Sequence, residues 1–114
     1  MILRTNDMKR ETRERMRGGD GRVDLLHLED AARMKHTRLL ARMTLEPGSG
    51  IGEHEHVNET EYYIILAGTA EVVDDGKPVT ATAGDVVVTG GGASHSIRNA
   101  GDTVLDMIAL IILD

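Results

Sequence analysis

The chain has 114 residues, no cysteine and a formal net charge of −6 at pH 7. This length fits one domain, and the negative charge disfavours nucleic acid or an anionic membrane as the main partner. The lack of cysteine excludes disulfides and thiolate metal sites. No apolar run approaches the roughly 20 residues that span a bilayer, and no signal-peptide pattern is visible, so we expect a cytoplasmic protein.

Residues 1–21 form an N-terminal arm in which basic side chains predominate, whereas acidic ones predominate in the rest of the chain. The stretch from Asp7 to Met16 is rich in helix formers, so the arm is predicted to be a short helix or an extended segment. Glycines at 18, 19 and 21 then end any helix. We interpret the basic arm as a solvated surface or a dimer contact, in preference to a nucleic-acid contact.

Residues 22–114 show apolar residues with a period of two, which is typical of strands. The clearest case is residues 36–46, where Leu39, Ala41, Met43 and Leu45 on one face alternate with Arg38, Leu40, Arg42 and Thr44 on the other. Turn signals follow at 47–50, 74–77 and 99–102. Strands are predicted near 22–28, 36–46, 51–57, 61–67, 69–73, 78–82, 85–89, 94–98 and 103–113. Many short strands with frequent turns indicate an all-β sandwich or barrel.

Two predicted strands, 62–67 and 104–113, are apolar on both faces. A strand that is covered on one side only should alternate apolar and polar residues. The outward residues therefore need cover, and in so small a chain we expect a second subunit to supply it, giving a homodimer. The alternative is that the N-terminal arm of the same chain covers them.

Four metal-ligating residues stand among glycines in two distant segments. His54 and His56 are two apart, so both point to one face of a strand. Glu61 is an odd number of residues further on, and the polar run between them can turn and restore its direction. His95 follows a triple glycine. Three imidazoles and one carboxylate can hold one divalent transition metal (Mn, Fe, Ni, Co or Zn), and octahedral geometry would leave two positions open.

Each of these signals also has a simpler explanation. A His-x-His pair alone is more often structural or at the surface than a metal site, and a single histidine after glycines says little. Glu53 and Glu55 flank the histidines and should point away from them. His27 and His36 have no partner pattern, so we expect both at the surface.

The spacing in the two segments resembles the two motifs of the cupin superfamily. Gly48, His54, His56, Glu61 and Gly68 fit its first motif, G-x5-H-x-H-x3,4-E-x6-G. Gly84, Gly92, His95 and Asn99 fit the second, G-x5-P-x-G-x2-H-x3-N, although Gly90 stands in place of the proline. The resemblance, which is to single-domain oxalate-decarboxylase-like or oxalate-binding-like bacterial cupins, implies a jelly-roll barrel (double-stranded β-helix) over residues 22–114. It also implies one metal on His54, His56, Glu61 and His95, with Asn99 closing a turn.

The interior expected around this metal is apolar and poor in aromatic residues. Counting by twos along the strands predicts that the ligand pocket is lined by Met43, Ile65, Ile97 and Met107. Such a pocket suits a small oxygenated anion, either a dicarboxylate or a 2-oxo acid, held through two oxygens on the metal. Glu59 on the loop is the best candidate for a proton carrier, and Tyr63 is the second.

Two functions remain open from the sequence. The first, which we take as the main prediction, is a metal-dependent enzyme, such as a dioxygenase, decarboxylase or isomerase, that acts on a small oxygenated anion. The second is a binding or sensing module that holds an oxalate-like ligand on the metal without turnover. The lack of a well-placed acid or base favours the second, whereas the complete ligand set argues against a purely structural barrel, because four buried polar groups would be left unpaired.

Overall fold

The computed structural model describes all residues from 1 to 114 and consists of ten strands and three single 3-10 turns. None of its helices is long and apolar enough to cross a membrane. The strands are β1 (Lys9–Glu14), β2 (Arg22–His27), β3 (Thr37–Leu45), β4 (Gly50–Glu55), β5 (Glu59–Ala67), β6 (Thr69–Asp74), β7 (Lys77–Thr82), β8 (Val86–Gly90), β9 (Ser94–Asn99) and β10 (Leu105–Leu113). The 3-10 turns are η1 (Thr5–Asp7), η2 (Met16–Gly18) and η3 (Ala31–Arg33).

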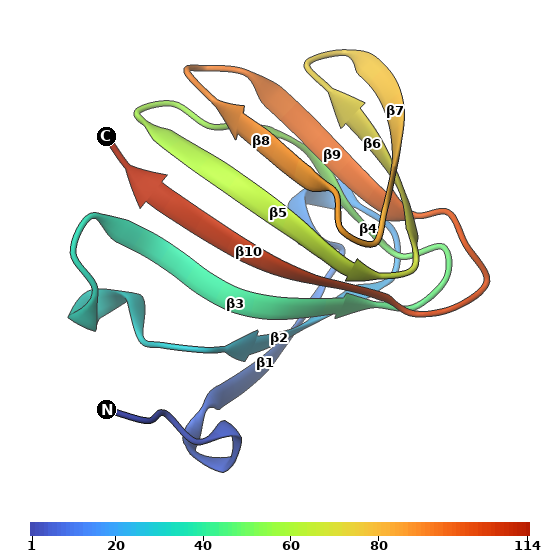
Figure 1. Ribbon diagram of the computed structural model, residues 1–114. Coiled ribbons are helices and arrows are strands. Elements are labelled where there is room, and N and C mark those ends of the chain that lie inside the picture. Colours follow the sequence, from blue (N-terminus) through green and yellow to red (C-terminus); the bar gives the residue numbers. More distant parts are fainter.

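The strands form two antiparallel sheets that face each other (Figure 1). One sheet has six strands in the order β1-β2-β3-β10-β5-β8, and the other has four in the order β4-β9-β6-β7. Neighbours in each sheet come from distant parts of the chain, as in the pairing of β10 with both β3 and β5. The predicted all-β, single-domain jelly-roll fold is confirmed.

The interior between the sheets follows the alternation seen in the sequence. Along β3, Leu39, Ala41, Met43 and Leu45 are buried and Arg38 and Arg42 are exposed, as predicted. The 17 buried apolar residues form one cluster that fills the barrel. Nearly all of them are aliphatic, and Tyr63 is the one aromatic member. The core is therefore closed by Leu, Ile, Val, Met and Ala side chains, as the composition requires.

The turns also have the conformations that their residues favour. Asp74 pairs with Lys77, and the two residues between them, Asp75 and Gly76, both have positive φ, at 47° and 84°. Two left-handed residues in a two-residue loop define the type I′ hairpin turn that the Asp-Gly pair predicts.

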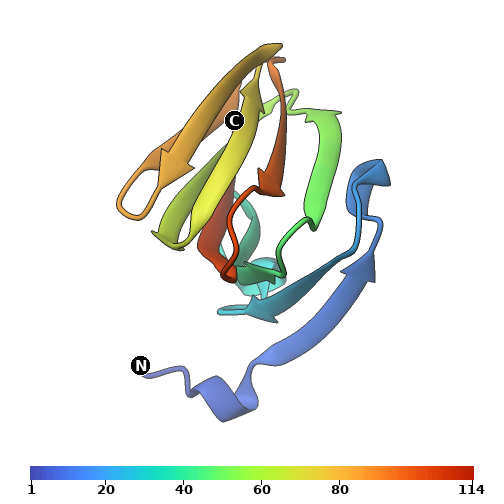
Figure 2. The same cartoon turned by 90° about the vertical axis from the view of Figure 1, so that its right-hand side faces the viewer.

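The N-terminal arm differs from the helical alternative. The structure has strand β1 where helix formers predicted a helix, and β1 extends the six-stranded sheet beyond β2 (Figure 2). Cross-strand contacts explain the difference, because Thr12 bonds Asp24 and Glu11 contacts His27 on β2. Such pairs stabilise a strand by more than the weak helix propensity favours the helix.

The arm returns to the barrel at η2, which lies directly on β4. A Cβ at Gly52 would collide with the carbonyl oxygen of Arg17, and a Cβ at Gly19 would collide with that of Gly50. One glycine of β4, Gly52, and one of the arm, Gly19, therefore allow backbone to approach backbone. Met16 packs against the core cluster from this turn.

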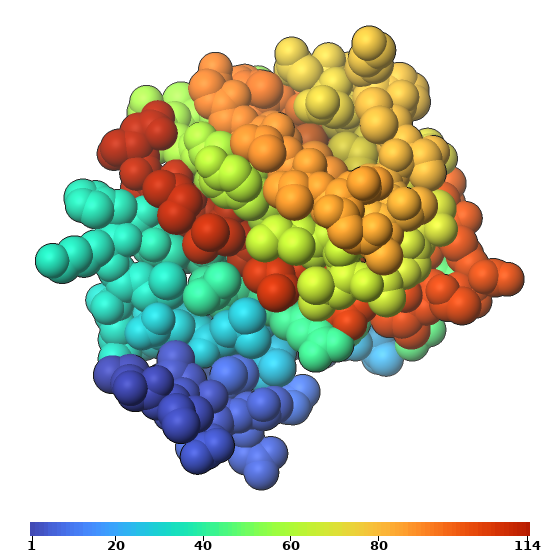
Figure 3. All heavy atoms as spheres, viewed as in Figure 1, coloured from blue at the N-terminus to red at the C-terminus, as the bar shows by residue number.

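The outer face of the six-stranded sheet carries a continuous apolar patch, which we call the outer patch. Ile64 pairs with both Ile108 and Val86, and Tyr62 pairs with both Leu110 and Val88. The patch consists of Tyr62, Ile64, Leu66, Val86, Val88, Ile108, Leu110 and Ile112. In Figure 3 the strands β10, β5 and β8 lie at the surface of this face, and the N-terminal arm lies beside them without covering them. The arm of the same chain therefore leaves the outer patch uncovered.

We predict that Asn99→Ala destabilises the protein, because Asn99 closes the turn before β10. Its side-chain amide donates to the carbonyl oxygens of Leu45 and Thr103, and its side-chain oxygen accepts from the amide of Gly101. Leaving buried backbone groups unpaired should lower the free energy of unfolding by about 2–3 kcal/mol. Urea denaturation of the metal-free protein measures this.

The control is Thr12→Val, which removes one exposed hydrogen bond to Asp24. This change should cost less than about 1 kcal/mol, as for other exposed groups. An equal loss of unfolding free energy in both variants would show that the buried hydrogen bonds of Asn99 stabilise the protein no more than one exposed bond does.

Candidate metal site

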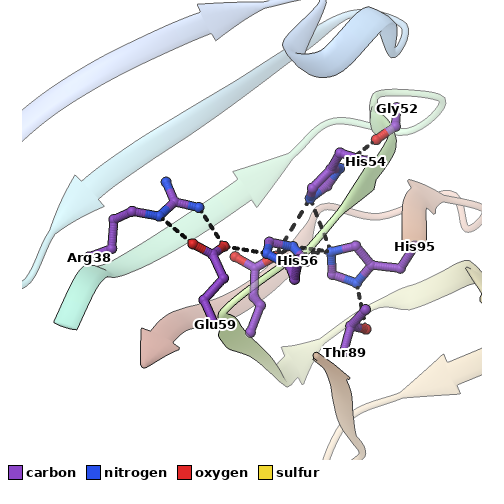
Figure 4. A network of polar contacts seen from close by, with 8 residues as sticks. Arg38, Gly52, His54, His56, Glu59, Thr89 and His95 are labelled. Atoms are coloured by element: carbon purple, nitrogen blue, oxygen red, sulfur yellow. Dashed lines mark hydrogen bonds and ion pairs between the residues drawn. The ribbon is translucent and has the colours of Figure 1, made fainter. Parts of the chain in front are cut away.

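Three strands from the two sheets bring the four predicted ligands together (Figure 4). His54 lies on β4 and pairs directly with His95 on β9. His56 follows the end of β4, where its backbone bonds Ala93 and Gly92 beside β9. Glu61 comes from β5 in the opposite sheet. All four side chains point into the space between the sheets.

The turn between β4 and β5 restores the direction of Glu61, as the sequence required. Asn58 adopts a left-handed φ of 59°, and its carbonyl oxygen accepts from the amide of Asp114. Asparagine is one of the few residues that tolerate this conformation. From Glu59 onward β5 alternates, so Glu61, Tyr63 and Ile65 share the interior face.

The ligand atoms converge on one point. The Nε2 atom of His95 lies 3.0 Å from that of His56 and 3.1 Å from that of His54. Oε1 of Glu61 lies 3.0 Å from Nε2 of both His56 and His95 and 3.8 Å from that of His54. All four atoms lie within 4.8 Å of one another. His56, Glu61 and His95 are 1–3% exposed, and His54 is the most open of the four.

Each imidazole turns its other nitrogen to a partner outside the cluster (Figure 4). Nδ1 of His54 lies 2.7 Å from the carbonyl oxygen of Gly52, which can only accept a hydrogen bond. Nδ1 of His95 lies 2.9 Å from the hydroxyl of Thr89, and Nδ1 of His56 lies 2.5 Å from Oε2 of Glu59. These contacts leave Nε2 of each ring directed at the common point, where a lone pair can bind a metal.

The charges of the buried groups suit metal binding. Burial alone would raise the pKa of Glu61, but the neighbouring imidazoles lower it to about 2, so this carboxyl is ionised. Burial lowers the pKa of His95 below its usual 6.5, although Glu61 opposes the shift. A carboxylate and a neutral imidazole are the forms in which these side chains bind metals.

The four residues fit a divalent transition metal. Oε1 of Glu61 is buried and has no hydrogen bond, although Nε2 of His56 and Nε2 of His95 each lie 3.0 Å away. Ligand atoms held at about 2.0–2.2 Å from one ion lie about 3 Å apart when they are adjacent. The separations of 3.0–3.1 Å among Glu61, His56, His95 and His54 match this spacing, and an ion would satisfy the unpaired oxygen.

The two predicted proton carriers have different surroundings. Tyr63 is buried and its ring stacks on His95, with centroids 4.9 Å apart and planes at 3°. Burial, and then the nearby Glu61 carboxylate, raise the pKa of Tyr63 well above 10, so its hydroxyl stays protonated. Glu59 accepts two hydrogen bonds from Arg38, which lower its pKa even though burial opposes the shift. Their catalytic assignment stays a prediction.

The predicted pocket residues, Met43, Ile65, Ile97 and Met107, all belong to the buried core cluster. Their contact with a ligand stays a prediction. Glu53 and Glu55 are exposed, as expected, and so is His36, whereas His27 contacts Glu11 of β1. Neither Thr89 nor the pairing of Arg38 with Glu59 was among the features predicted from the sequence. The period of β8 could have placed Thr89 on the interior face, but nothing in the pattern indicated its contact with His95.

A family profile described as "Cupin domain" matches residues 41–112. The chain belongs to the cupin family, and the resemblance seen in the two motifs is confirmed.

Known proteins resemble the chain in sequence or in fold. The chain is 46% identical to the oxalate-binding protein of Thermotoga maritima over 99% of its own length and 94% of that protein. The crystal structure of a predicted oxalate decarboxylase from Thermotoga maritima superposes with a TM-score of 0.94 at 45% identity, with complete coverage of both chains. The polyketide cyclase RemF from Streptomyces resistomycificus shares the fold at 16% identity, with a TM-score of 0.78 over 100% of this chain and 80% of RemF.

We predict that the metal-free protein loses stability in two steps on acidification. The folded pKa of His95 lies below the unfolded value of 6.5, so the unfolded chain binds the extra proton first as the pH falls below about 6.5. The pKa of Glu61 is about 2 in the folded protein and 4.5 in the unfolded chain. Its contribution to the free energy of unfolding is therefore present above pH 4.5 and is lost as the pH falls from 4.5 to 2. Both effects lower the melting temperature with falling pH.

Thermal melts in a chelator-containing buffer series measure the effect. His95→Gln should remove the first step, and Glu61→Gln should remove the second. A melting temperature that stays constant from pH 7 to 5 would contradict the neutral state of His95.

Proposed function

We propose that the protein binds one divalent transition metal through His54, His56, Glu61 and His95. The observation that carries this proposal is the convergence of three Nε2 atoms on the buried, unpaired Oε1 of Glu61. Imidazole and carboxylate suit Mn, Fe, Ni, Co and Zn alike, so the choice among these ions is left to measurement.

We propose further that a small oxygenated anion, an oxalate-like dicarboxylate or a 2-oxo acid, binds at this site. A bound ion would supply Lewis acidity and open coordination positions for two oxygens of such a chelator. The aliphatic interior around the ligands excludes water and strengthens electrostatic attraction there. The printed name of the Thermotoga relative, an oxalate-binding protein, also supports this class of ligand.

Binding without turnover is the function that the geometry supports best. A proton carrier near neutral pH needs a pKa close to the working pH. The pKa of Tyr63 is raised well above 10 and that of Glu59 is lowered, so both groups are shifted away from that range. Turnover as a decarboxylase is the second candidate, because the Thermotoga neighbour is described as a predicted oxalate decarboxylase.

We predict that oxalate binding requires the metal. Calorimetric titration with oxalate should give one binding site per chain after reconstitution with Mn²⁺ or Zn²⁺, and no heat of binding after chelation. His54→Ala, His56→Ala and His95→Ala should each weaken metal affinity by more than about 100-fold, because each removes a ligand. The melting curves should still show folded protein.

His36→Ala is the control, because His36 is exposed and outside the cluster.

Carbon dioxide release from oxalate, with O₂ uptake recorded, separates the two candidate functions. Turnover would favour the enzyme, whereas one bound metal and bound oxalate without turnover would favour the binding module. A wild-type chain that takes up no metal after reconstitution would disprove the site.

We also propose that two copies associate through the outer patch to form a homodimer. In one chain Val86 and Val88 are about half exposed, and Leu66 and Ile112 are also exposed. Their neighbours on β5 and β10 are apolar too, so a second copy of the same face would remove a continuous surface from water. A two-fold axis makes such a patch complementary to itself.

We predict that Val88→Glu converts the dimer into a monomer, because a buried unpaired carboxylate is costly in an apolar interface. Light scattering after gel filtration should give twice the chain mass of 12.4 kDa for the wild type and the single mass for the variant. Val104→Glu is the control, since Val104 is also exposed but lies before β10, outside the patch. A wild type with the mass of one chain would disprove the dimer.

A further inference from the structure

A charged group stands behind one of the three imidazoles. Oε2 of Glu59 lies 2.5 Å from Nδ1 of His56 and also accepts from Nη2 of Arg38 at 2.7 Å. Oε1 of Glu59 accepts from Nε of Arg38 at 2.8 Å. Both carboxylate oxygens are therefore engaged, and the three residues form a continuous chain that ends at the ligand cluster (Figure 4).

His56 is the one ligand of the three with a charged outer partner. His54 faces a backbone carbonyl and His95 faces a hydroxyl. A carboxylate held by a bidentate arginine can only accept, so the proton of the His56 ring lies on Nδ1 and the lone pair on Nε2. Carboxylate partners of this kind fix the ring orientation of a ligating histidine and raise its basicity.

An irregularity of the sheet lies at Arg38. Leu39 pairs with Ile111 and Thr37 pairs with Ile112, so Arg38 has no partner in β10. The extra residue is a bulge, a feature that re-aims a side chain at the end of a ladder. From there Arg38 reaches across β10 to the first residue of β5, since the sheet order is β3-β10-β5.

We propose that Glu59 and Arg38 are positioning residues for the metal. Glu59 holds the His56 ring with Nε2 toward the other ligands, and Arg38 holds Glu59 in the orientation that this requires. The inference rests on the proposed metal site and deepens it. It gives Glu59 a role different from that of the proton carrier predicted from the sequence.

The test is Co²⁺ binding by Glu59→Gln and Arg38→Gln, followed by competition titration and by visible absorption of the bound ion. Glu59→Gln should weaken Co²⁺ affinity by about 10–100-fold, the range for outer partners of metal ligands, and should change the absorption bands. Arg38→Gln, which leaves Glu59 in place, should give a smaller loss in the same direction. Arg38→Lys should restore part of it, because lysine keeps the charge without the bidentate geometry.

The chain contains a matched control in the pair of Arg42 and Asp106, which also joins a β3 arginine to a carboxylate by two hydrogen bonds. Side-chain exposure is 49% and 16% for Arg42 and Asp106, against 47% and 12% for Arg38 and Glu59. Arg42→Gln and Asp106→Asn should match the Arg38 and Glu59 variants in melting temperature of the metal-free protein. They should leave Co²⁺ affinity and spectrum unchanged.

Two outcomes would overturn the inference, and they are distinguishable. If the wild type binds Co²⁺ and both Glu59→Gln and Arg38→Gln bind it with the same affinity and spectrum, the positioning role is wrong while the metal site stands. If the wild type itself binds no Co²⁺, Zn²⁺ or Mn²⁺, the proposed function fails and the inference fails with it.

Discussion

Four polar ligand atoms gathered inside an aliphatic barrel are the constraint on which the rest of the structure depends. His54, His56 and His95 come from one sheet and Glu61 from the other, so the two sheets must stack at a separation that lets these atoms meet. Buried polar atoms without partners are costly, and Oε1 of Glu61 is such an atom. Close aliphatic packing around the cluster holds this separation, because well-packed cores do not deform continuously.

The scaffold orients the site from outside. The three imidazole planes stand at 66–87° to one another, so the rings meet edge to face and not stacked. Each orientation is set by an outer contact on a different element: Gly52 on β4, Thr89 on β8 and Glu59 at the start of β5. The arrangement is therefore built into the chain before any ion is present, which reduces the reorganisation that binding requires.

The sequence predicted the fold well because it depends on a period of two, and it predicted the grouping of the ligands because their spacing follows two known motifs. Alternation along β3 and β5 identified the interior faces, and the two motifs brought His95 to the other ligands. The strand β1 was missed as a firm prediction because its stability comes from contacts with β2 and not from its own propensities. The pairing of Arg38 with Glu59 was also missed, since an alternating pattern places Arg38 outside and gives no sign of the bulge that redirects it.

The close contact between η2 and β4 bears on where the functional unit begins. A boundary at residue 21 follows the change in composition, yet the backbone of the segment before it rests on Gly50 and Gly52, four and two residues ahead of His54. Glycine at positions 19 and 52 leaves no side chain to separate the two segments, so the arm packs backbone to backbone on the strand that carries His54. Residue 21 is therefore a boundary in composition, whereas the packing of the arm on β4 continues across it.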